Sequence, residues 1–266
     1  MSIPSPKSVR MSLVNGYFCP QLEEVKPYKT DRWDKKEEVE LMFDNISGKY
    51  DLLNKVLSLG TDRNWRKKAL STLIPVHPAT IIDVATGTGD MVFMADKLLK
   101  PKSIIGIDLS SGMLEIARKR LINKSEDLKA SIEFLKGDAE NLDFGSNMFD
   151  AATVAFGVRN FADLQAGLKE IQRVLRQGAP IVVLEFTKPR IFPFRQIFDI
   201  YFKNLLPLIG SWTSGDRRAY KYLYESVQAF PDFDAFNQEL IKAGFERPDF
   251  KPLSAGICAI YIAYKS

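Results

Sequence analysis

The sequence contains few of the residues on which disulfide-rich and metal-binding proteins depend. Its two cysteines, Cys19 and Cys258, give no disulfide framework, and this scarcity suggests a reducing cytosol. Together with the single histidine, His77, they are too few to build a Cys/His metal site, so no metal is expected. His77 stands between Pro75 and Pro78, and we interpret it as a structural residue of a loop.

Long apolar runs and a strong net charge are also missing. No run of about eighteen uncharged apolar residues occurs, which argues against a transmembrane helix. Lys7 and Arg10 have no apolar stretch behind them, which argues against a secretory signal. The net charge of +4 is too small to indicate nucleic-acid binding, although it suits a weak attraction to anionic lipid.

The chain is long enough for one large α/β domain with an accessory element. Residues 1–34, with several prolines and little periodicity, are predicted to be an extension that is partly disordered or draped over the domain. Residues 35–266 are predicted to form the main domain. Within it, we expect residues 35–75 to be a helical cap and residues 190–220 to be an apolar lid or substrate-binding insertion.

Apolar strand patterns alternate with helical patterns through most of the chain. Strands are predicted over residues 80–84, 103–108, 131–135, 148–156 and 179–186, and then over 246–252 and 257–264. Helices are predicted over residues 35–58, 90–99, 111–122, 163–175 and 234–243, with one more after Gly60 that Asp62 is expected to cap. The pattern predicts an α/β fold, a mostly parallel seven-stranded Rossmann-like sheet with helices on both faces and an antiparallel edge strand.

The first predicted strand of this sheet ends in the turn Gly87-Thr88-Gly89, which is typical of nucleotide binding. Glycines there let the backbone approach a ligand, and the next helix offers free N–H groups at its start. Asp108 follows Gly89 at about the spacing at which a carboxylate meets a ribose hydroxyl. Val92 stands where a dinucleotide-binding turn needs a third glycine, which favours S-adenosylmethionine over NAD.

Two later strands also end in polar residues. Asp138, in Gly137-Asp138-Ala139-Glu140, could accept a hydrogen bond from an adenine amino group, or it could belong to a plain surface turn. Arg159 and Asn160 follow the fourth predicted strand, where a guanidinium could stabilise negative charge on a substrate. The alternative is an Arg159 that bridges to Asp163 or Glu170 on the next helix.

Glu185 ends the fifth predicted strand and is a further candidate acid of the cleft. Beyond it, residues 191–212 are unusually apolar. Phe194 and Phe198 belong to one helical stripe, which packing on the core would explain. Ile200 and Phe202 lie on the opposite face, and a lid, a substrate channel or a membrane-surface contact would use them. Both interpretations stay open.

From about Lys36 to the C-terminus, the chain resembles the UbiE/MenG family of quinone-biosynthesis C-methyltransferases. The most specific elements are Tyr50-Asp51-x-x-Asn54, Phe156-Gly157-x-Arg159-Asn160 and Leu184-Glu185-Phe186. The resemblance implies a class I S-adenosylmethionine-dependent methyltransferase with donor contacts at Thr88, Asp108, Asp138 and Ala139, besides the turn glycines Gly87 and Gly89. The chain departs from the family at Ala155, where relatives have a serine, and at Thr86, where they often have glycine.

The reaction that the resemblance implies is methyl transfer to a ring carbon of a prenylated hydroquinone, most simply demethylmenaquinol to menaquinol. In this interpretation Arg159 and Asn160 hold a ring oxyanion. Tyr50 and Asn54 close over the ring, and Glu185 lies on the substrate side. Because no histidine base is present, we expect water relayed by Arg159 or Tyr50 to take the ring proton.

Several alternatives are open at this point. The acceptor could be the benzoquinol of ubiquinone biosynthesis, both quinols, or another lipid. A non-catalytic subunit of a quinone-synthesis assembly and an NAD-dependent oxidoreductase are less favoured. The protein is expected in the cytoplasm, with contact at the inner face of the membrane and a homodimer both left open, and without a nucleic-acid partner.

Overall fold

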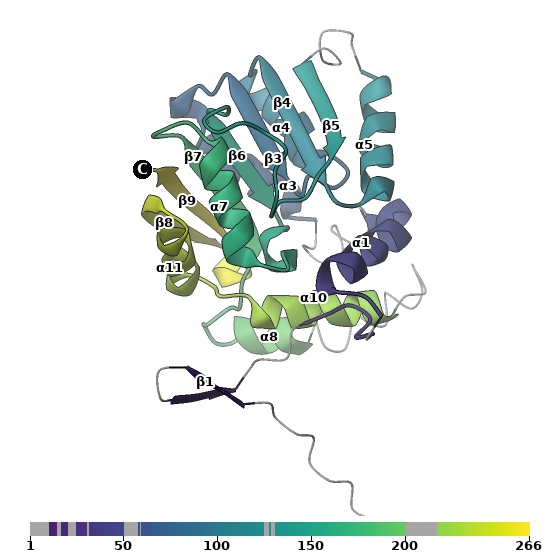
Figure 1. The fold of residues 1–266 in the computed structure, drawn as a ribbon, viewed down its shortest axis with the longest axis vertical. Coiled ribbons are helices and arrows are strands. Elements are labelled where there is room, and N and C mark those ends of the chain that lie inside the picture. Colours follow the sequence, from purple (N-terminus) through teal and green to yellow (C-terminus); the bar gives the residue numbers. More distant parts are fainter. Residues whose placement is uncertain are drawn as a thin grey trace, which may run out of the picture.

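A computed structural model of the chain describes residues 11–14, 17–20, 25–30, 32–50, 58, 60–124, 128, 131–200 and 217–266. Its centre is a seven-stranded sheet with the strand order β5-β4-β3-β6-β7-β9-β8 (Figure 1). The strands are β3 (Thr80–Val84), β4 (Ser103–Asp108), β5 (Ile132–Lys136), β6 (Ala151–Ala155), β7 (Pro180–Phe186), β8 (Phe245–Leu253) and β9 (Cys258–Lys265). The first five are parallel, and β9 runs antiparallel to both β7 and β8. The predicted fold class is confirmed.

Helices connect and cover these strands. They are α1 (Lys35–Ile46), α3 (Asp62–Ser71), α4 (Asp90–Leu99), α5 (Ser111–Ile122), α7 (Leu164–Val174), α8 (Phe194–Ile200), α10 (Arg217–Ala229) and α11 (Asp234–Lys242). Short 3₁₀ turns are η1 (Ser47–Lys49), η2 (Ile74–Val76), η3 (Val158–Asn160) and η5 (Ser254–Gly256), and β1 (Met11–Val14) pairs with β2 (Tyr17–Pro20). In the described part of the chain, no helix has the length and apolar character needed to cross a membrane.

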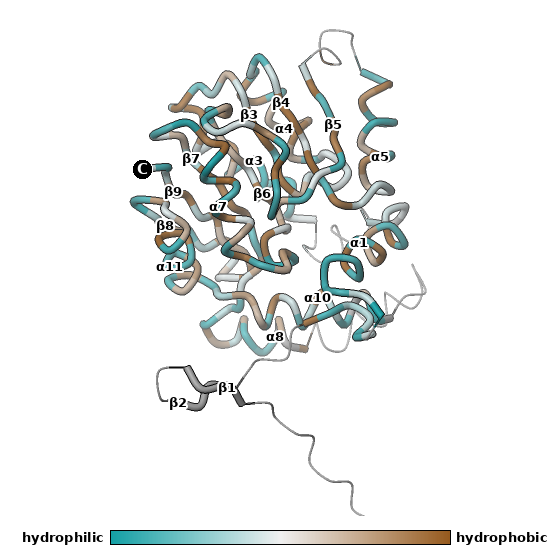
Figure 2. Tube along the Cα trace, in the orientation of Figure 1, coloured by the Kyte–Doolittle hydropathy of each residue, from teal (hydrophilic) through white to brown (hydrophobic). Residues whose placement is uncertain are grey.

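The sheet has an apolar layer on each face. Side chains alternate between the two layers, so that Ile81 on β3 packs with α3, α4 and α5, whereas Ile82 packs with α7 and α11. Both isoleucines are fully buried. Figure 2 shows the resulting apolar colour along the central strands. Parallel strands covered on both faces read as continuous apolar runs, which is why the sequence pattern was informative here.

Some element boundaries differ from the prediction. The third parallel strand covers 132–136 rather than 131–135, and the fourth is confined to 151–155. Asp62 does not cap α3, because Thr61 occupies the cap position and Asp62 is the first helical residue. The Asp62 carboxylate instead accepts a hydrogen bond from Ser58 Oγ at 3.0 Å. The helix predicted over 35–58 has α1 and η1 in its first part, and residues 51–57 lie outside the described residues.

Close packing between neighbouring strands generates a stability prediction. A Cβ atom added at Gly106 of β4 would lie 2.8 Å from Phe134 Cδ1 and 2.8 Å from Thr86 Oγ1. We therefore expect Gly106→Ala to lower the free energy of unfolding by about 1–3 kcal/mol, measured by urea denaturation. Gly145→Ala is the control, because its nearest neighbour would be the flexible Met148 Sδ at 3.4 Å. Equal stability of the two variants would contradict this packing.

Candidate active site

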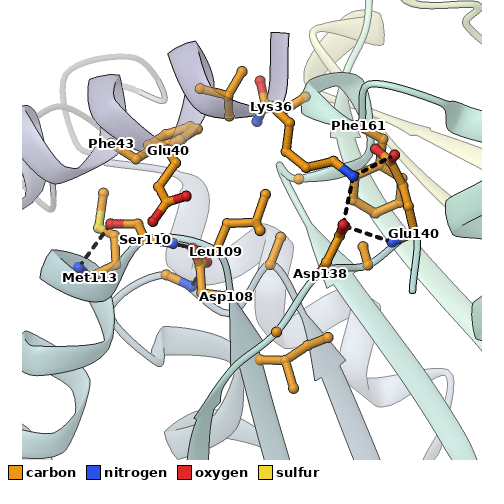
Figure 3. Close-up of a pocket in the computed structure, with 18 of the residues that line it drawn as sticks. Lys36, Glu40, Phe43, Asp108, Leu109, Ser110, Met113, Asp138, Glu140 and Phe161 are labelled. Carbon is orange, nitrogen blue, oxygen red and sulfur yellow. Dashed lines mark hydrogen bonds and ion pairs between the residues drawn. The ribbon is translucent and has the colours of Figure 1, made fainter. Parts of the chain in front are cut away.

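A cavity lies where the carboxyl ends of the parallel strands meet α1. Loops after β3, β4, β5 and β6 form one wall, and α1 forms the opposite wall (Figure 3). The space between these walls is about 690 Å³, a volume that includes the open mouth. Of the predicted site residues, those that line the cavity are Tyr50, Gly87, Asp108, Asp138, Ala139 and Asn160.

The glycine turn is held from below by a buried carboxylate. Asp83, at the end of β3, accepts hydrogen bonds from Thr86 Oγ1 at 2.6 Å and from Thr153 Oγ1 on β6 at 2.5 Å. Burial raises the pKa of Asp83 to about 6, although both hydroxyls favour its ionised form. Gly87 and Gly89 have φ values of +57° and +84°, the left-handed region that glycine adopts without strain.

Asp108 connects this turn to the end of β4. Its Oδ2 accepts a hydrogen bond from the Gly87 backbone N–H at 2.8 Å, and its Oδ1 accepts one from Ser110 N–H at 2.9 Å. The pKa of Asp108 is raised to about 6, mainly by burial and also by the nearby carboxylates of Asp44 and Glu40. The cavity wall thus presents a carboxylate oriented by two backbone donors, suited to accept hydrogen bonds from a ligand hydroxyl.

An ion-pair cluster joins α1 to the loop after β5. Lys36 Nζ lies 2.6 Å from Asp138 Oδ2 and 3.0 Å from Glu140 Oε2, as Figure 3 shows. Burial alone would lower the pKa of Lys36, but the two carboxylates raise it. A ligand amino group that reaches Asp138 would therefore share this carboxylate with Lys36 or displace it.

The sequence prediction missed most of the wall that α1 supplies. Besides Lys36, the helix contributes Glu40 and Phe43, which Figure 3 shows on the side facing Asp108. Asp44 fixes the helix in place, because its Oδ1 accepts hydrogen bonds from Ser110 Oγ at 2.6 Å and from the Gly112 backbone at 2.9 Å. The sequence signal that could have indicated this wall is the segment Phe43-Asp44-Asn45, which lies shortly before Tyr50-Asp51-x-x-Asn54, one of the elements that resemble the UbiE/MenG family.

Arg159 does not line the cavity. Its side chain is 3% exposed, and Nη1 donates to Glu185 Oε1 and to the Phe156 carbonyl, each at 2.6 Å. Burial raises the pKa of Glu185, and the Arg159 guanidinium opposes that rise. The alternative, a bridge to Asp163 or Glu170, is not formed either, since Asp163 caps α7 and Glu170 pairs with Arg173. Arg159 and Glu185 form a buried ion pair beneath the cavity.

The remaining predicted residues fall into three groups. Asn160 lines the cavity, and its Oδ1 accepts a hydrogen bond from Tyr222 Oη of α10 at 3.1 Å. Thr88 is buried and its hydroxyl accepts a hydrogen bond from Arg120 at 3.2 Å, so only its neighbour Gly87 reaches the cavity. Asn54 lies outside the described residues. Among the residues described, no group of His, Cys, Asp and Glu could hold a metal ion.

Polar groups that follow successive parallel strands, together with a glycine turn at a helix start, define a Rossmann-like site for a nucleoside-containing ligand. The chain belongs to the ubiE/COQ5 methyltransferase family, whose model matches residues 30–265. It is therefore a methyltransferase, and both the predicted family and the predicted enzyme class are confirmed. The predicted methyl donor, S-adenosylmethionine, agrees with the fold and the family.

Individual relatives cover nearly the whole chain. It is 46% identical to the demethylmenaquinone methyltransferase of Bacteroides fragilis, over 91% of this chain and 98% of the relative. It is 39% identical to the ubiquinone/menaquinone biosynthesis C-methyltransferase UbiE of Geotalea daltonii, over 87% of this chain and 98% of the relative. A solved SAM-dependent methyltransferase from Thermotoga maritima superposes with a TM-score of 0.61 at 21% identity, covering 86% of this chain and all of that one. That likeness establishes the fold.

The Arg159–Glu185 pair generates a second stability prediction. Glu185→Gln leaves the buried guanidinium without its counter-charge, so the free energy of unfolding should fall by roughly 3–5 kcal/mol in urea denaturation. The control is Glu115→Gln, which removes an ion pair to Lys119 between two largely exposed side chains and should leave stability unchanged. If Glu185→Gln were as stable as this control, the buried pair would not be holding the turn before Asn160.

Proposed function

We propose that this protein transfers the methyl group of S-adenosylmethionine to a ring carbon of demethylmenaquinol and so produces menaquinol. The main support for the proposal is the end-to-end similarity to enzymes named demethylmenaquinone methyltransferase, with 46% sequence identity to the Bacteroides fragilis relative. The cavity supports it, because a polar wall of strand ends suited to a nucleoside faces aromatic side chains suited to a quinol ring.

On the donor side, we assign the ribose hydroxyls to Asp108 and the adenine to Asp138 and Ala139. Support comes from the fixed orientation of the Asp108 carboxylate and from the place of all three residues in the cavity wall. Gly87 lets the backbone lie close to the ligand, whereas a Cβ atom at Gly89 would lie 2.8 Å from the Phe134 ring, so contact of Gly89 with the donor stays a prediction. Thr88 acts from beneath, through the hydrogen bond that its hydroxyl accepts from Arg120.

On the acceptor side, the aromatic rings of Phe43, Tyr50, Phe156 and Phe161 enclose the quinol. The donor supplies an activated methyl group, and the chain aligns the ring carbon with it. The new bond joins ring carbon and methyl carbon while the carbon–sulfur bond breaks and its electrons stay on sulfur. The ring proton then leaves to water beside Tyr50. We assign the hydrogen bond to the ring oxygen to Asn160, which lines the cavity and donates only one of its two Nδ2 hydrogens to the Phe156 carbonyl.

Arg159 takes a positioning role in this proposal. It donates to the Phe156 carbonyl and pairs with Glu185, and so it fixes the turn that presents Asn160. Glu185 supports the acceptor site indirectly, through this pair. Asn54, expected to close over the ring with Tyr50 because the two residues stand at i and i+4, stays a prediction.

A methyl-transfer assay tests the reaction. Purified protein and labelled S-adenosylmethionine would be offered reduced demethylmenaquinone and its benzoquinol counterpart in detergent micelles. Label in the naphthoquinol is expected. Label in both would extend the substrate range to both quinone pathways, an outcome that the name of the Geotalea daltonii relative favours. No transfer to either, with donor binding intact, would overturn the proposal and indicate another lipid acceptor or a non-catalytic subunit.

We also propose that the enzyme works at the cytoplasmic face of the inner membrane, because a prenylated quinol resides in the bilayer. Contact with the membrane surface needs no spanning helix, in agreement with the helices of the described residues. The homodimer that the sequence left open stays a prediction, to be tested by sedimentation equilibrium.

The raised pKa of Asp108 predicts a pH dependence of donor binding. The ionised carboxylate is the form that accepts hydrogen bonds from ribose, and its pKa in the free protein is about 6. Below pH 6 the proton competes with the ligand, so affinity should be about tenfold lower at pH 5 than at pH 7 in calorimetric titrations. Asp108→Asn should bind more weakly at pH 7 and lose this dependence. If donor affinity still depends on pH in Asp108→Asn, another group is responsible for the titration, and Asp83 is the first candidate.

The hydrogen bond from Tyr222 to Asn160 predicts a separation of rate from donor affinity. Tyr222→Phe removes one of the two hydrogen bonds that orient the Asn160 amide and leaves only the donation from Nδ2 to the Phe156 carbonyl at 3.3 Å, so kcat should fall about tenfold while the Kd of the donor stays within about twofold. Tyr264→Phe on β9 is the matched control, because Tyr264 does not line the cavity. An unchanged kcat for Tyr222→Phe would show that the orientation of Asn160 does not limit the transfer.

A further inference from the structure

The turn before α8 and α8 itself expose an unusual amount of apolar surface. Ile191 is 61% exposed, Phe192 77%, Phe194 44% and Ile200 61%. In the described part of the chain, nine large apolar side chains are exposed, and these four lie within ten residues. Phe198, by contrast, is buried with the core beneath α8. The helix is therefore anchored through Phe198, whereas these four neighbouring apolar side chains remain in contact with water, which is unfavourable unless something covers them.

The charge around this segment indicates what covers it. Residues 188–221 contain seven Lys and Arg against two Asp and no Glu, a net charge of +5. The whole chain has a net charge of +4, so the rest of it is close to neutral. Arg195 is exposed beside the apolar side chains, and no carboxylate of the described residues pairs with it. Arg190 is 64% exposed and pairs with Asp232 at 3.3 Å, and Lys221 on α10 is 68% exposed and pairs with Glu225 at 3.6 Å. Apolar side chains surrounded by cations match a bilayer that has anionic headgroups around an acyl interior.

A second copy of the chain would fit this surface less well. In a two-fold symmetric dimer the patch would face itself, and the cations of both copies would be brought together. Like charges opposed across an interface weaken association. The same cations strengthen association with an anionic membrane.

The location of the segment agrees with the proposed acceptor. Figure 1 shows α8 at the same end of the molecule as α10 and α1. The helix α1 forms a wall of the cavity, and α10 reaches it through the Tyr222–Asn160 hydrogen bond. A bilayer in contact with α8 would thus lie at the end of the protein where α1 and α10 border the cavity.

We propose that Ile191, Phe192, Phe194 and Ile200 form a membrane-inserting wedge, and that Arg195 holds an anionic lipid headgroup beside it. The proposal rests on the proposed function for its purpose, because a prenylated acceptor is what makes membrane contact useful. Its test is independent of that function, since vesicle binding requires neither donor nor quinol.

The test is sedimentation of the protein with vesicles of equal parts phosphatidylglycerol and phosphatidylcholine. Phe192→Ser should lower the partition coefficient about tenfold, because the most exposed ring of the wedge no longer enters the acyl region. Ile122→Ser is the control, because Ile122 is 66% exposed at the far end of α5 and should bind like the wild type. Arg195→Gln should weaken binding severalfold on anionic vesicles and leave binding to pure phosphatidylcholine unchanged, with exposed Lys67→Gln as its control.

Binding of Phe192→Ser equal to that of Ile122→Ser would overturn the proposal. A second outcome would also overturn it: Phe192→Ser lowers the oligomeric mass measured at sedimentation equilibrium and leaves vesicle binding unchanged. The patch would then be an interface between copies of the chain. Methyl transfer to a short-tailed, water-soluble quinol separates the two proposals. The Phe192→Ser protein should still methylate this quinol. If the wild-type protein does not methylate it, the proposed reaction is refuted, whereas the proposed membrane contact is unaffected.

Discussion

The geometry of the site depends on the buried carboxylate of Asp83. A carboxylate that is 2% exposed between strands has to be hydrogen-bonded or neutralised. Its two oxygens accept hydrogen bonds from the hydroxyls of Thr86 and Thr153. These bonds join the end of β3 to the glycine turn and to β6. The turn fixed in this way directs the Gly87 N–H to Asp108 at the end of β4. Three neighbouring strand ends are thus held by hydrogen bonds before a ligand arrives, and binding does not have to order them.

Much of the fold could be predicted, because buried parallel strands leave a plain pattern in the sequence. The strands Thr80–Val84 and Ser103–Asp108 and the helices Asp90–Leu99 and Ser111–Ile122 have the predicted bounds. The fourth strand was predicted too long, because Phe149 is buried and apolar without belonging to β6. The backbone N–H of Phe149 donates a hydrogen bond to the Val174 carbonyl, ahead of the first residue of β6. An apolar sequence pattern does not reveal such a long-range pairing.

The site residues could be predicted where the order of the strands alone determines their position. They could not be predicted where their position depends on the packing of distant segments. Carboxyl ends of parallel strands share one edge, so Asp108, Asp138 and Asn160 were expected together and do line one cavity. The wall from α1 depends on how a distant helix folds back, which no local spacing encodes. The partner of Arg159 was missed for a related reason. Local spacing suggested the next helix, whereas the pairing of β6 with β7 brings Glu185 beneath the turn.

The burial of Arg159 agrees with the charge changes of the proposed reaction. A quinolate that attacks a sulfonium joins a negative and a positive charge and yields two neutral products. A surrounding of low polarity favours such a step, because it stabilises the separated charges of the reactants less than water does. An unpaired guanidinium in the cavity would hold the oxyanion tightly and make the ring carbon less nucleophilic. The structure instead pairs Arg159 with Glu185 below the cavity and leaves a neutral amide, Asn160, among aromatic rings. In the proposed reaction, this arrangement would orient the quinol oxygen while its electrons remain available to the ring carbon.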